Sequence, residues 1–292
     1  MRPTTTFGNT IKLLRIPFSL FLMPVFLLAI SQIRDFDTAR AWWAFFIIHL
    51  LVYPSSNGYN SYIDRDETPI GGLLRPPKPT LALLYTTIGL DILAVLLAFF
   101  AVKPLFAACI VAYIAASRAY SSPQIRLKKY PFWGFAVVVF FQGAFTYYMT
   151  NVGASQAPFA WALPNIYILL AASLQIAGAY PLTQIYQHEA DQKDGVTTLS
   201  YVLGYRGTFI FCGICLLLCN VFYFLYFSNI GLIAHFYWLQ IILLPTILYF
   251  ARWFWQVHRD TAAANFKRTM LMNALSSLSM SLFAILLILC QR

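Results

Sequence analysis

Charged residues are scarce in this 292-residue chain. Only 10% of its residues are Asp, Glu, Lys or Arg, while 60% are hydrophobic and the mean hydropathy is +0.68. This composition excludes an ordinary soluble globular domain and predicts a protein that crosses a membrane several times. Membrane lipid is therefore its expected surroundings, and no nucleic-acid partner is expected.

Cysteine is also rare, and its five positions carry no pairing signal. All five lie in predicted spans, where Cys packs as a small apolar residue, so no disulfide framework is implied. The first apolar segment lacks a clear cleavage site of small residues. We therefore expect this segment to be retained as a span rather than removed as a signal peptide.

Long apolar runs fill most of the chain. About nine of them approach the roughly 20 residues that cross a bilayer as a helix. They lie near residues 17–33, 41–63, 81–101, 103–119, 132–150, 162–186, 207–228, 232–251 and 269–290. Only helices satisfy their own backbone at that length in lipid, so the expected fold class is an all-α integral membrane bundle. Short loops predict one transmembrane domain over residues 1–292.

The basic residues are divided unevenly between the two sets of loops. Sixteen of the twenty Lys and Arg residues fall at the N-terminus and in the loops after the second, fourth, sixth and eighth spans. The positive-inside rule places these segments in the cytoplasm, and an odd number of spans places the C-terminus outside. We expect a multi-pass protein of a cell's inner membrane, in which most basic residues anchor the chain at a negatively charged leaflet.

One polar pattern occurs twice. It reads Tyr-Pro-Ser-Ser-Asn-Gly-Tyr-Asn-Ser-Tyr-Ile-Asp at residues 53–64 and Tyr-Pro-Leu-Thr-Gln-Ile-Tyr-Gln-His-Glu-Ala-Asp at residues 180–191. Tyr, Pro, a hydroxyl, an amide, Tyr, a second amide and Asp recur in register, which indicates two pseudo-repeated halves of about residues 1–153 and 154–292. Polar groups are costly inside a membrane bundle, so this pattern marks the expected functional site.

Most acidic residues fall in two short windows that contain or follow these repeats. They are Asp64, Asp66, Glu67, Glu189, Asp191 and Asp194. Two negative clusters that face one another repel unless a metal ion or a set of Arg and Lys residues lies between them. The spacing i, i+3, i+7 relates Asn57, Asn60 and Asp64, and the same spacing relates Gln184, Gln187 and Asp191, which predicts that each trio lies on one helix face. Amide and carboxylate oxygens suit Mg²⁺.

Basic residues are expected on the same membrane face. Arg75 and Lys78 follow the first trio, and residues 120–131 read Tyr-Ser-Ser-Pro-Gln-Ile-Arg-Leu-Lys-Lys-Tyr-Pro. Acids and amides for a cation, together with Arg and Lys for an anion, suit a diphosphate bridged by a metal ion. Such a site stabilises the charge that develops on a diphosphate as its bond to carbon breaks.

These motifs resemble those of the UbiA superfamily of intramembrane prenyltransferases. That family has nine transmembrane helices, two Asp-rich motifs at the cytoplasmic ends of helices 2 and 6, and a basic loop of the form Tyr-Ser-x-Pro-x-Arg-x-Lys. With one residue inserted, the corresponding residues here are Tyr120, Ser121, Pro123, Arg126 and Lys128. The resemblance extends from residues 14–17 through the last span.

The resemblance implies transfer of a polyisoprenyl group from its diphosphate to a hydrophobic acceptor, an aromatic ring or another lipid, with Mg²⁺ as cofactor. In the family, acids of both motifs hold Mg²⁺ and the diphosphate, and we expect Asp64 and Asp191 to keep the main catalytic and metal-binding roles here. Further metal ligands would be Asp66, Glu67 and Asp194. The residues expected to bind the diphosphate are Asn57, Asn60, Gln184, Gln187, Arg75, Lys78, Tyr120, Arg126 and Lys128.

Four of the carboxylates that the family's motifs contain are amides here. The matching positions read Ser56-Asn57-x-x-Asn60-x-x-x-Asp64 and Gln184-x-x-Gln187-x-x-x-Asp191. An alternative register makes Asn60 the opening Asn of the first motif, but the repeat favours the former. Fewer carboxylates weaken Mg²⁺ binding. An intramembrane terpene cyclase and a diverged lipid-binding member of the same fold therefore stay open as alternatives.

Two single residues leave further alternatives open. Asp91 is the one acid well inside a predicted span, where it is either a hydrogen-bonded buried carboxyl or a proton relay of a transporter. His188 lies within the second repeat and either forms a plain hydrogen bond or acts as a base toward an acceptor. The acceptor, the prenyl chain length, the number of metal ions and the oligomeric state do not follow from the sequence.

Overall fold

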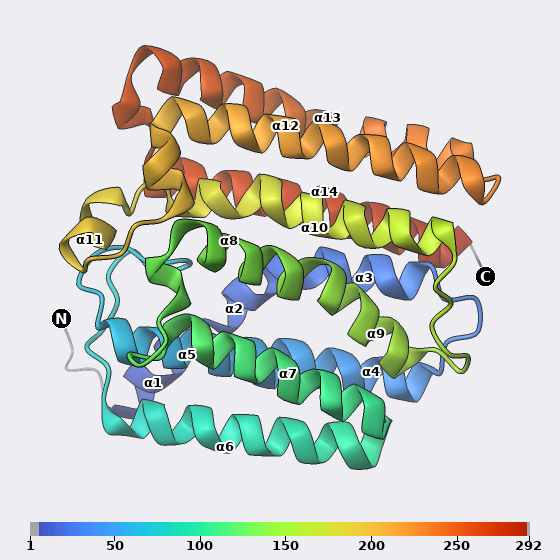
Figure 1. Ribbon diagram of the computed structural model, residues 1–292, viewed down its shortest axis with the longest axis horizontal. Coiled ribbons are helices and arrows are strands. Elements are labelled where there is room, and N and C mark those ends of the chain that lie inside the picture. Colours follow the sequence, from blue (N-terminus) through green and yellow to red (C-terminus); the bar gives the residue numbers. More distant parts are fainter. Residues whose placement is uncertain (1–5, 291–292) are drawn as a thin grey trace.

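The computed structural model describes residues 6–290 as a bundle of helices that run roughly along one common direction (Figure 1). Within these residues no strand forms, and the only β-type contacts are two isolated bridges, Phe36 with Ser155 and Ile70 with Leu73. The all-α fold class is therefore confirmed. Helices are the expected result, because they satisfy every interior backbone N–H and C=O within the segment itself.

The first half of the chain forms the lower layers of the bundle in Figure 1. Its elements are α1 (Thr6–Leu14), α2 (Ile16–Ser19), η1 (Leu20–Leu22), α3 (Met23–Ser31), α4 (Thr38–Phe45), η2 (Phe46–Val52), α5 (Tyr53–Asp64), α6 (Leu81–Leu97), η3 (Ala98–Val102), α7 (Pro104–Ser121), η4 (Leu127–Lys129), α8 (Pro131–Phe140), η5 (Phe141–Phe145) and α9 (Thr146–Ala154). The two halves meet where α3 lies beside α14 and where α8 and η5 lie beside α10.

The second half forms the upper layers. Its elements are α10 (Leu163–Gln184), α11 (His188–Lys193), α12 (Leu199–Asn229), α13 (Ile233–Arg259), η6 (Thr261–Ala263) and α14 (Phe266–Cys290). The most extensive packing in the bundle is between α10 and α12. One large apolar cluster draws mainly on α4, η2, α7 and α9, and another on α10, α12 and α14, with α3 contributing to both. The division into pseudo-repeated halves remains a prediction.

Eight helical segments between residues 6 and 290 are long and apolar enough to cross a membrane. They are Thr6–Ser31, Leu81–Val102, Pro104–Ser121, Pro131–Ala154, Leu163–Gln184, Leu199–Asn229, Ile233–Arg259 and Phe266–Cys290. The remaining expected span, residues 41–63, is also helical, because α4, η2 and α5 follow one another without a break. Its second half carries the first polar motif and is therefore less apolar than the other eight.

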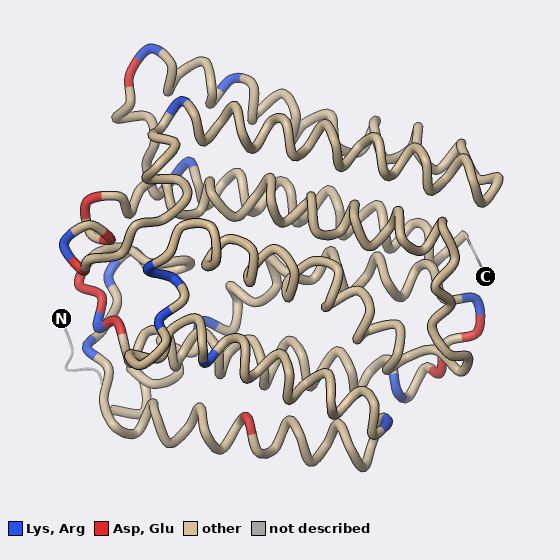
Figure 2. Tube along the Cα trace, in the orientation of Figure 1, with Lys and Arg blue, Asp and Glu red and all other residues tan. Residues whose placement is uncertain are grey.

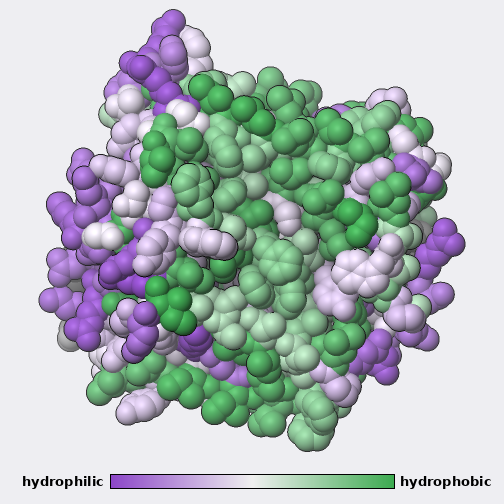
Figure 3. Space-filling view, viewed as in Figure 1, coloured by the Kyte–Doolittle hydropathy of each residue, from purple (hydrophilic) through white to green (hydrophobic). Residues whose placement is uncertain are grey.

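The surface agrees with a protein that crosses a membrane several times. Figure 3 shows a broad apolar band between two polar ends. Large apolar side chains such as Leu217, Ile241 and Leu278 are exposed within the long helices, as is required where lipid tails form the solvent. The direction in which the bundle is inserted stays a prediction.

An ion pair inside the bundle corrects one part of the charge analysis. Arg118, one of the sixteen basic residues that the charge count places in the cytoplasmic segments, lies within α7 and forms an ion pair with Asp91 of α6. The Ser55 hydroxyl donates to the Asp91 carboxylate at 2.6 Å, and the Arg118 guanidinium lies 3.9 Å from the centre of the Tyr59 ring. Asp91 is thus a paired, hydrogen-bonded carboxylate. In a low-dielectric interior each of these charges needs the other.

Glycines allow neighbouring helices to approach closely, both between the two halves and within the second half. A Cβ atom on Gly143 of η5 would lie only 2.5 Å from the Cα atom of Ser173 in α10, and the Ala144 N–H donates to the Ser173 hydroxyl at 3.0 Å. Between α10 and α12, a Cβ on Gly178 would lie 2.6 Å from Cγ of Leu216. Small residues at such positions are typical of packed membrane helices.

We predict that Gly143→Ala destabilises the protein by about 1–3 kcal/mol, the usual cost of overpacking, because the clash is with backbone that cannot rotate away. The measurement is the melting temperature of the detergent-purified protein. Gly89→Ala in α6 is the matched control, since no atom lies within 4 Å of the added methyl group. Equal melting temperatures for the two variants would contradict this packing.

Candidate functional site

Acidic and basic residues meet at one end of the bundle (Figure 2). Here α5 ends at Asp64, because Arg65 adopts a left-handed conformation with φ 53° and turns the chain into the loop of residues 65–80. The loop after α7 and the turn between α10 and α11 lie at the same end. Both polar repeats and the basic stretch are thus brought to one place, as predicted.

Asp64 is an enclosed carboxylate of this cluster. Its side chain is 6% exposed and forms an ion pair with the Lys128 ammonium group, itself 10% exposed. One Arg126 guanidinium nitrogen lies 4.0 Å from the same Asp64 oxygen, and the Asn60 amide donates to the other oxygen at 2.7 Å. The basic loop therefore neutralises the acid of the first repeat.

Arg15 completes this cluster, and sequence reasoning assigned it only to membrane topology. Its guanidinium donates to the Asn57 carbonyl oxygen at 3.1 Å and lies 3.5 Å from the Asn60 side-chain oxygen. Arg15 is buried and adopts a left-handed conformation, φ 49°, between α1 and α2. Such a conformation is uncommon outside glycine and is often found at functional sites. The sequence contains one signal for this break between helices, because Arg15 stands just before Ile16 and Pro17, where a new helix begins.

The second repeat does not form one continuous helix. Since α10 ends at Gln184 and α11 begins at His188, the prediction that Gln184, Gln187 and Asp191 share one helix face is wrong. Gln187 stands outside both helices, and its side-chain amide donates to the Pro69 carbonyl oxygen at 3.1 Å. This contact ties the turn to the loop that follows the first repeat. The two repeats are therefore alike in sequence but different in local structure.

Gln184 is buried at the end of α10. Its amide nitrogen donates to the Tyr180 hydroxyl at 2.9 Å, while its oxygen has no hydrogen-bond partner among residues 6–290. The Tyr180 hydroxyl also lies 2.5 Å from that of Tyr120, so a hydrogen bond joins α10 to α7. This contact with the opposite half of the bundle places Tyr120 beside the second repeat, and its role in binding a diphosphate stays a prediction.

Carboxyls from both repeats share one electrostatic environment. Burial, with repulsion from Asp64, raises the pKa of Asp66 to about 6. Burial also raises the pKa of Asp191 to about 7 against the attraction of Lys128, and repulsion from Asp66, Asp64 and Asp194 adds to the rise. These groups therefore lie close enough to oppose one another's ionisation.

Other predicted site residues lie apart from this cluster. Glu67 and Glu189 are exposed, and so are Arg75 and Lys78 in the loop after α5. Among residues 6–290 no ion pair joins Arg75 or Lys78 to the clustered carboxylates. The structure thus favours Arg15, Arg126 and Lys128 as the cations of the site.

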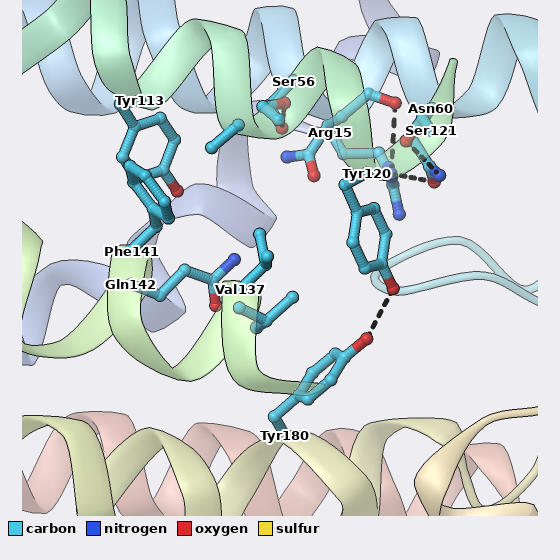
Figure 4. A pocket seen from close by; sticks show the side chains of 14 residues that line it. Arg15, Ser56, Asn60, Tyr113, Tyr120, Ser121, Val137, Phe141, Gln142 and Tyr180 are labelled. Atoms are coloured by element: carbon cyan, nitrogen blue, oxygen red, sulfur yellow. Dashed lines mark hydrogen bonds between the residues drawn. The ribbon is translucent and has the colours of Figure 1, made fainter. Parts of the chain in front are cut away.

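A cavity of about 130 Å³ opens beside the charged cluster (Figure 4). Its polar wall contains Arg15, Ser56, Asn57 and Asn60, and Figure 4 shows Tyr113, Phe141 and Gln142 on its other side. Gln142 belongs to η5, one of the π-helical segments of the bundle, which often mark functional sites.

Two further cavities lie along a path into the bundle. The first, of about 170 Å³, shares Ser56, Asn57, Tyr113, Gln142 and Tyr180 with the cavity beside the cluster. The second, of about 360 Å³, has mainly apolar walls from α10, α12, α13 and α14. Its boundary with the first is formed by Phe21, Ile176, Ala179, Asn273 and Ser276. An anion held at the cluster could therefore carry an apolar chain that extends inward.

A comparison with protein families decides the assignment. Residues 20–276 match the sequence model of the UbiA prenyltransferase family. The chain belongs to the UbiA prenyltransferase family. The resemblance drawn from the motifs is thereby confirmed, as is the class of enzyme, a prenyltransferase of the membrane.

Solved structures of this fold cover nearly the whole chain. A UbiA homolog from Archaeoglobus fulgidus bound to GPP and Mg²⁺ has a TM-score of 0.67 at 17% identity, over 96% of this chain and 99% of that one. The same homolog bound to DMAPP and Mg²⁺ gives 0.66 at 14% identity, with the same coverage. A digeranylgeranylglyceryl phosphate synthase gives 0.62 at 17% identity, over 97% and 99%. No curated protein sequence matches the chain.

His188 of this UbiA family member contacts α12 rather than the charged cluster. Its Nε2 atom lies 2.8 Å from the Ser200 hydroxyl of α12, and its ring stacks on Tyr205 at 4.8 Å between centroids. Burial lowers the pKa of His188 to about 4, so the ring is neutral at physiological pH. These contacts support the hydrogen-bonding alternative, in which His188 fixes α11 against α12.

We predict that Asn60→Asp lowers the melting temperature in EDTA and that Mg²⁺ restores it. The change removes a donor to Asp64 and places a second carboxylate beside it, a loss of about 1–3 kcal/mol. Thermal unfolding in EDTA and in Mg²⁺ measures both effects. Asn229→Asp, which adds the same charge on an exposed residue at the end of α12, is the control. An unchanged melting temperature in EDTA would contradict the Asn60–Asp64 contact.

Proposed function

We propose that this protein transfers a prenyl group from its diphosphate to a hydrophobic acceptor with the help of Mg²⁺. The observation that carries the proposal is the meeting of Arg15, Arg126 and Lys128 with carboxylates of both repeats at the mouth of the cavities. The solved homologs bound to GPP or DMAPP with Mg²⁺ support this choice of ligand class.

The diphosphate would be held by the three cations. Arg126 lies at 4.0 Å from Asp64, the outer limit of an ion pair, so its guanidinium can turn to an incoming anion at little cost. Arg15 is fixed by the Asn57 carbonyl and lines the cavity. Positive groups fixed in a water-poor site stabilise the charge that develops on a leaving diphosphate.

The carboxylate oxygens of the cluster are ligands of the type that a divalent cation such as Mg²⁺ prefers. Among residues 6–290 no three His, Cys, Asp or Glu side chains converge as a ready metal site. Asp66 and Asp191 nevertheless repel one another, and a bound cation would relieve that repulsion. We assign the metal to Asp66 and Asp191, with Asp64 and Asp194 around them. When bound, Mg²⁺ would neutralise charge on the leaving group.

The prenyl chain would follow the cavities inward. Tyr113 and Phe141 flank the first cavity, and the faces of such rings attract an allylic cation as the bond to the diphosphate breaks. The acceptor would then attack that carbon, and its proton would leave to solvent or phosphate. The apolar walls further in exclude water, which would otherwise compete as acceptor.

The amide substitutions favour a second candidate function, a diverged member that binds a prenyl lipid without cleaving a diphosphate. Gln184 and Gln187 are engaged with Tyr180 and with the Pro69 carbonyl, so their nitrogens serve internal contacts. A terpene cyclase is the further alternative. Product analysis separates the three, because a cyclase needs no acceptor and a lipid-binding protein leaves the diphosphate intact.

We predict that prenyl diphosphates with Mg²⁺ raise the melting temperature, and that the effect grows with chain length. A ligand at 100 times its dissociation constant stabilises by about 2.7 kcal/mol. Lys128→Gln should lose most of the shift, whereas Arg34→Gln, exposed at the opposite end of the bundle, should keep it. A shift in EDTA equal to that in Mg²⁺ would remove the metal from the proposal.

Turnover tests the catalytic assignment directly. Asp191→Ala and Asp64→Ala should each abolish diphosphate release, and Asp66→Asn should reduce it by about 100-fold or more. Glu67→Gln should have a much smaller effect, because this side chain is exposed. Asp35→Asn, in the exposed turn at the opposite end, is the control. Full activity in Asp191→Ala would overturn the assignment.

A further inference from the structure

A second charged cavity lies away from the candidate active site, between the end of α13 and the start of α14. Its volume is about 440 Å³, larger than any cavity beside the clustered carboxylates. Its lining is formed by Tyr249, Arg252, Trp253, Gln256, Asn265, Lys267, Arg268 and Leu271. Figure 2 shows basic residues around this turn, at the same end of the bundle as the candidate active site.

The cavity carries positive charge without compensation. Three of its lining residues, Arg252, Lys267 and Arg268, are cations, and no carboxylate lines it. Among residues 6–290, the side chains of Arg252 and Lys267 have no ion-pair or hydrogen-bond partner, and both residues are exposed. The acid nearest in sequence, Asp260, accepts a hydrogen bond from the Ala262 N–H at 2.9 Å and stays outside the lining.

Hydrogen bonds fix the backbone around the cavity. The Trp253 indole donates to the Ala263 carbonyl oxygen at 2.8 Å, and the Tyr249 hydroxyl donates to the Arg268 carbonyl oxygen at 3.2 Å. The Asn265 side chain accepts from the Arg268 N–H at 3.2 Å and so caps α14. The positive-inside rule explains why basic residues occur in this loop, but it does not require them to converge on one cavity.

Apolar side chains continue from the cations toward the middle of the membrane. On α13, Leu248 and Leu244 precede Arg252 at intervals of one helical turn, and both are exposed. On α14, Leu271 follows Lys267 by one turn and is exposed as well. An amphiphile with its phosphate between the cations would thus lay its acyl chains along both stripes.

We propose that this cavity binds a phosphate group, and specifically that of an anionic phospholipid headgroup. Convergent Arg and Lys side chains are the usual partners of phosphate oxygens, and basic pockets between membrane helices bind acidic lipids. The site is separate from the prenyl diphosphate site and is independent of the function proposed above. It would hold α13 and α14 together at the membrane surface.

The experiment measures thermal unfolding of delipidated full-length protein in EDTA, without prenyl diphosphate. Its three arms add phosphatidylglycerol, phosphatidylcholine or inorganic phosphate. The variants are Arg252→Gln, the double variant Arg252→Gln with Lys267→Gln, and Arg259→Gln. Arg259 is the matched control, because it ends the same helix but lies over the Trp255 ring at 3.8 Å, outside the cavity.

Phosphatidylglycerol should raise the melting temperature of the wild type and of Arg259→Gln, and phosphatidylcholine should do so much less. Arg252→Gln should lose at least half of the shift, and the double variant should lose nearly all of it. A shift with inorganic phosphate alone, lost in the double variant, would support a phosphate site with a soluble ligand instead. Equal shifts with both lipids, or a full shift in the double variant, would overturn the proposal.

The double variant also needs a check of its folding. Its melting temperature without lipid should match the wild type, because neither side chain makes a hydrogen bond in the described structure. If it fails to fold, the comparison of Arg252→Gln with Arg259→Gln decides alone. Equal affinity of these two single variants for phosphatidylglycerol would then overturn the site.

Discussion

The fold depends on how a few charges are neutralised where water is excluded. Lys128 with Asp64 joins the basic loop to the end of α5, and Arg118 with Asp91 joins α7 to α6. A lone charge in such surroundings is far more costly than in water, whereas a paired and hydrogen-bonded one is tolerated. These pairs therefore fix α7 beside α6 and the basic loop beside the end of α5, while apolar clusters pack the rest of the bundle. The candidate site contains the first of these ion pairs, Lys128 with Asp64.

The amides of the two motifs change the charge and the hydrogen bonding of the site while the fold stays that of the family. In the first motif Asn60 bridges Arg15, Asp64 and Ser121, a role that needs both a donor and an acceptor. A carboxylate could not donate there. The substitution thus lowers the negative charge of the site and at the same time organises its cations. In the proposed function, such a site would rely more on Arg and Lys, and less on metal, to hold an anion.

Composition and periodicity were enough to predict the helices, since a bilayer allows little else, and the repeat located the charged end of the bundle. They were not enough for contacts between distant segments. The spacing of Gln184, Gln187 and Asp191 is that of a helix, yet the helix ends at Gln184, and Gln187 instead donates to the carbonyl oxygen of Pro69, 118 positions away. Arg15 and Arg118 were interpreted only as charges that set the membrane topology, because the sequence does not show whether a side chain is buried or which partner it has.

The hydroxyl bridge between Tyr120 and Tyr180 joins the two halves of the bundle beside the cavity, and Gln184 donates to the same Tyr180 hydroxyl. Both partners of the bridge are neutral hydroxyl groups, so the bond contributes only about 0.5–1.5 kcal/mol. A polar group of a ligand in the cavity can replace either partner, because each hydroxyl both donates and accepts. The link between α7 and α10 at this point is therefore one that a bound ligand can exchange for its own contacts.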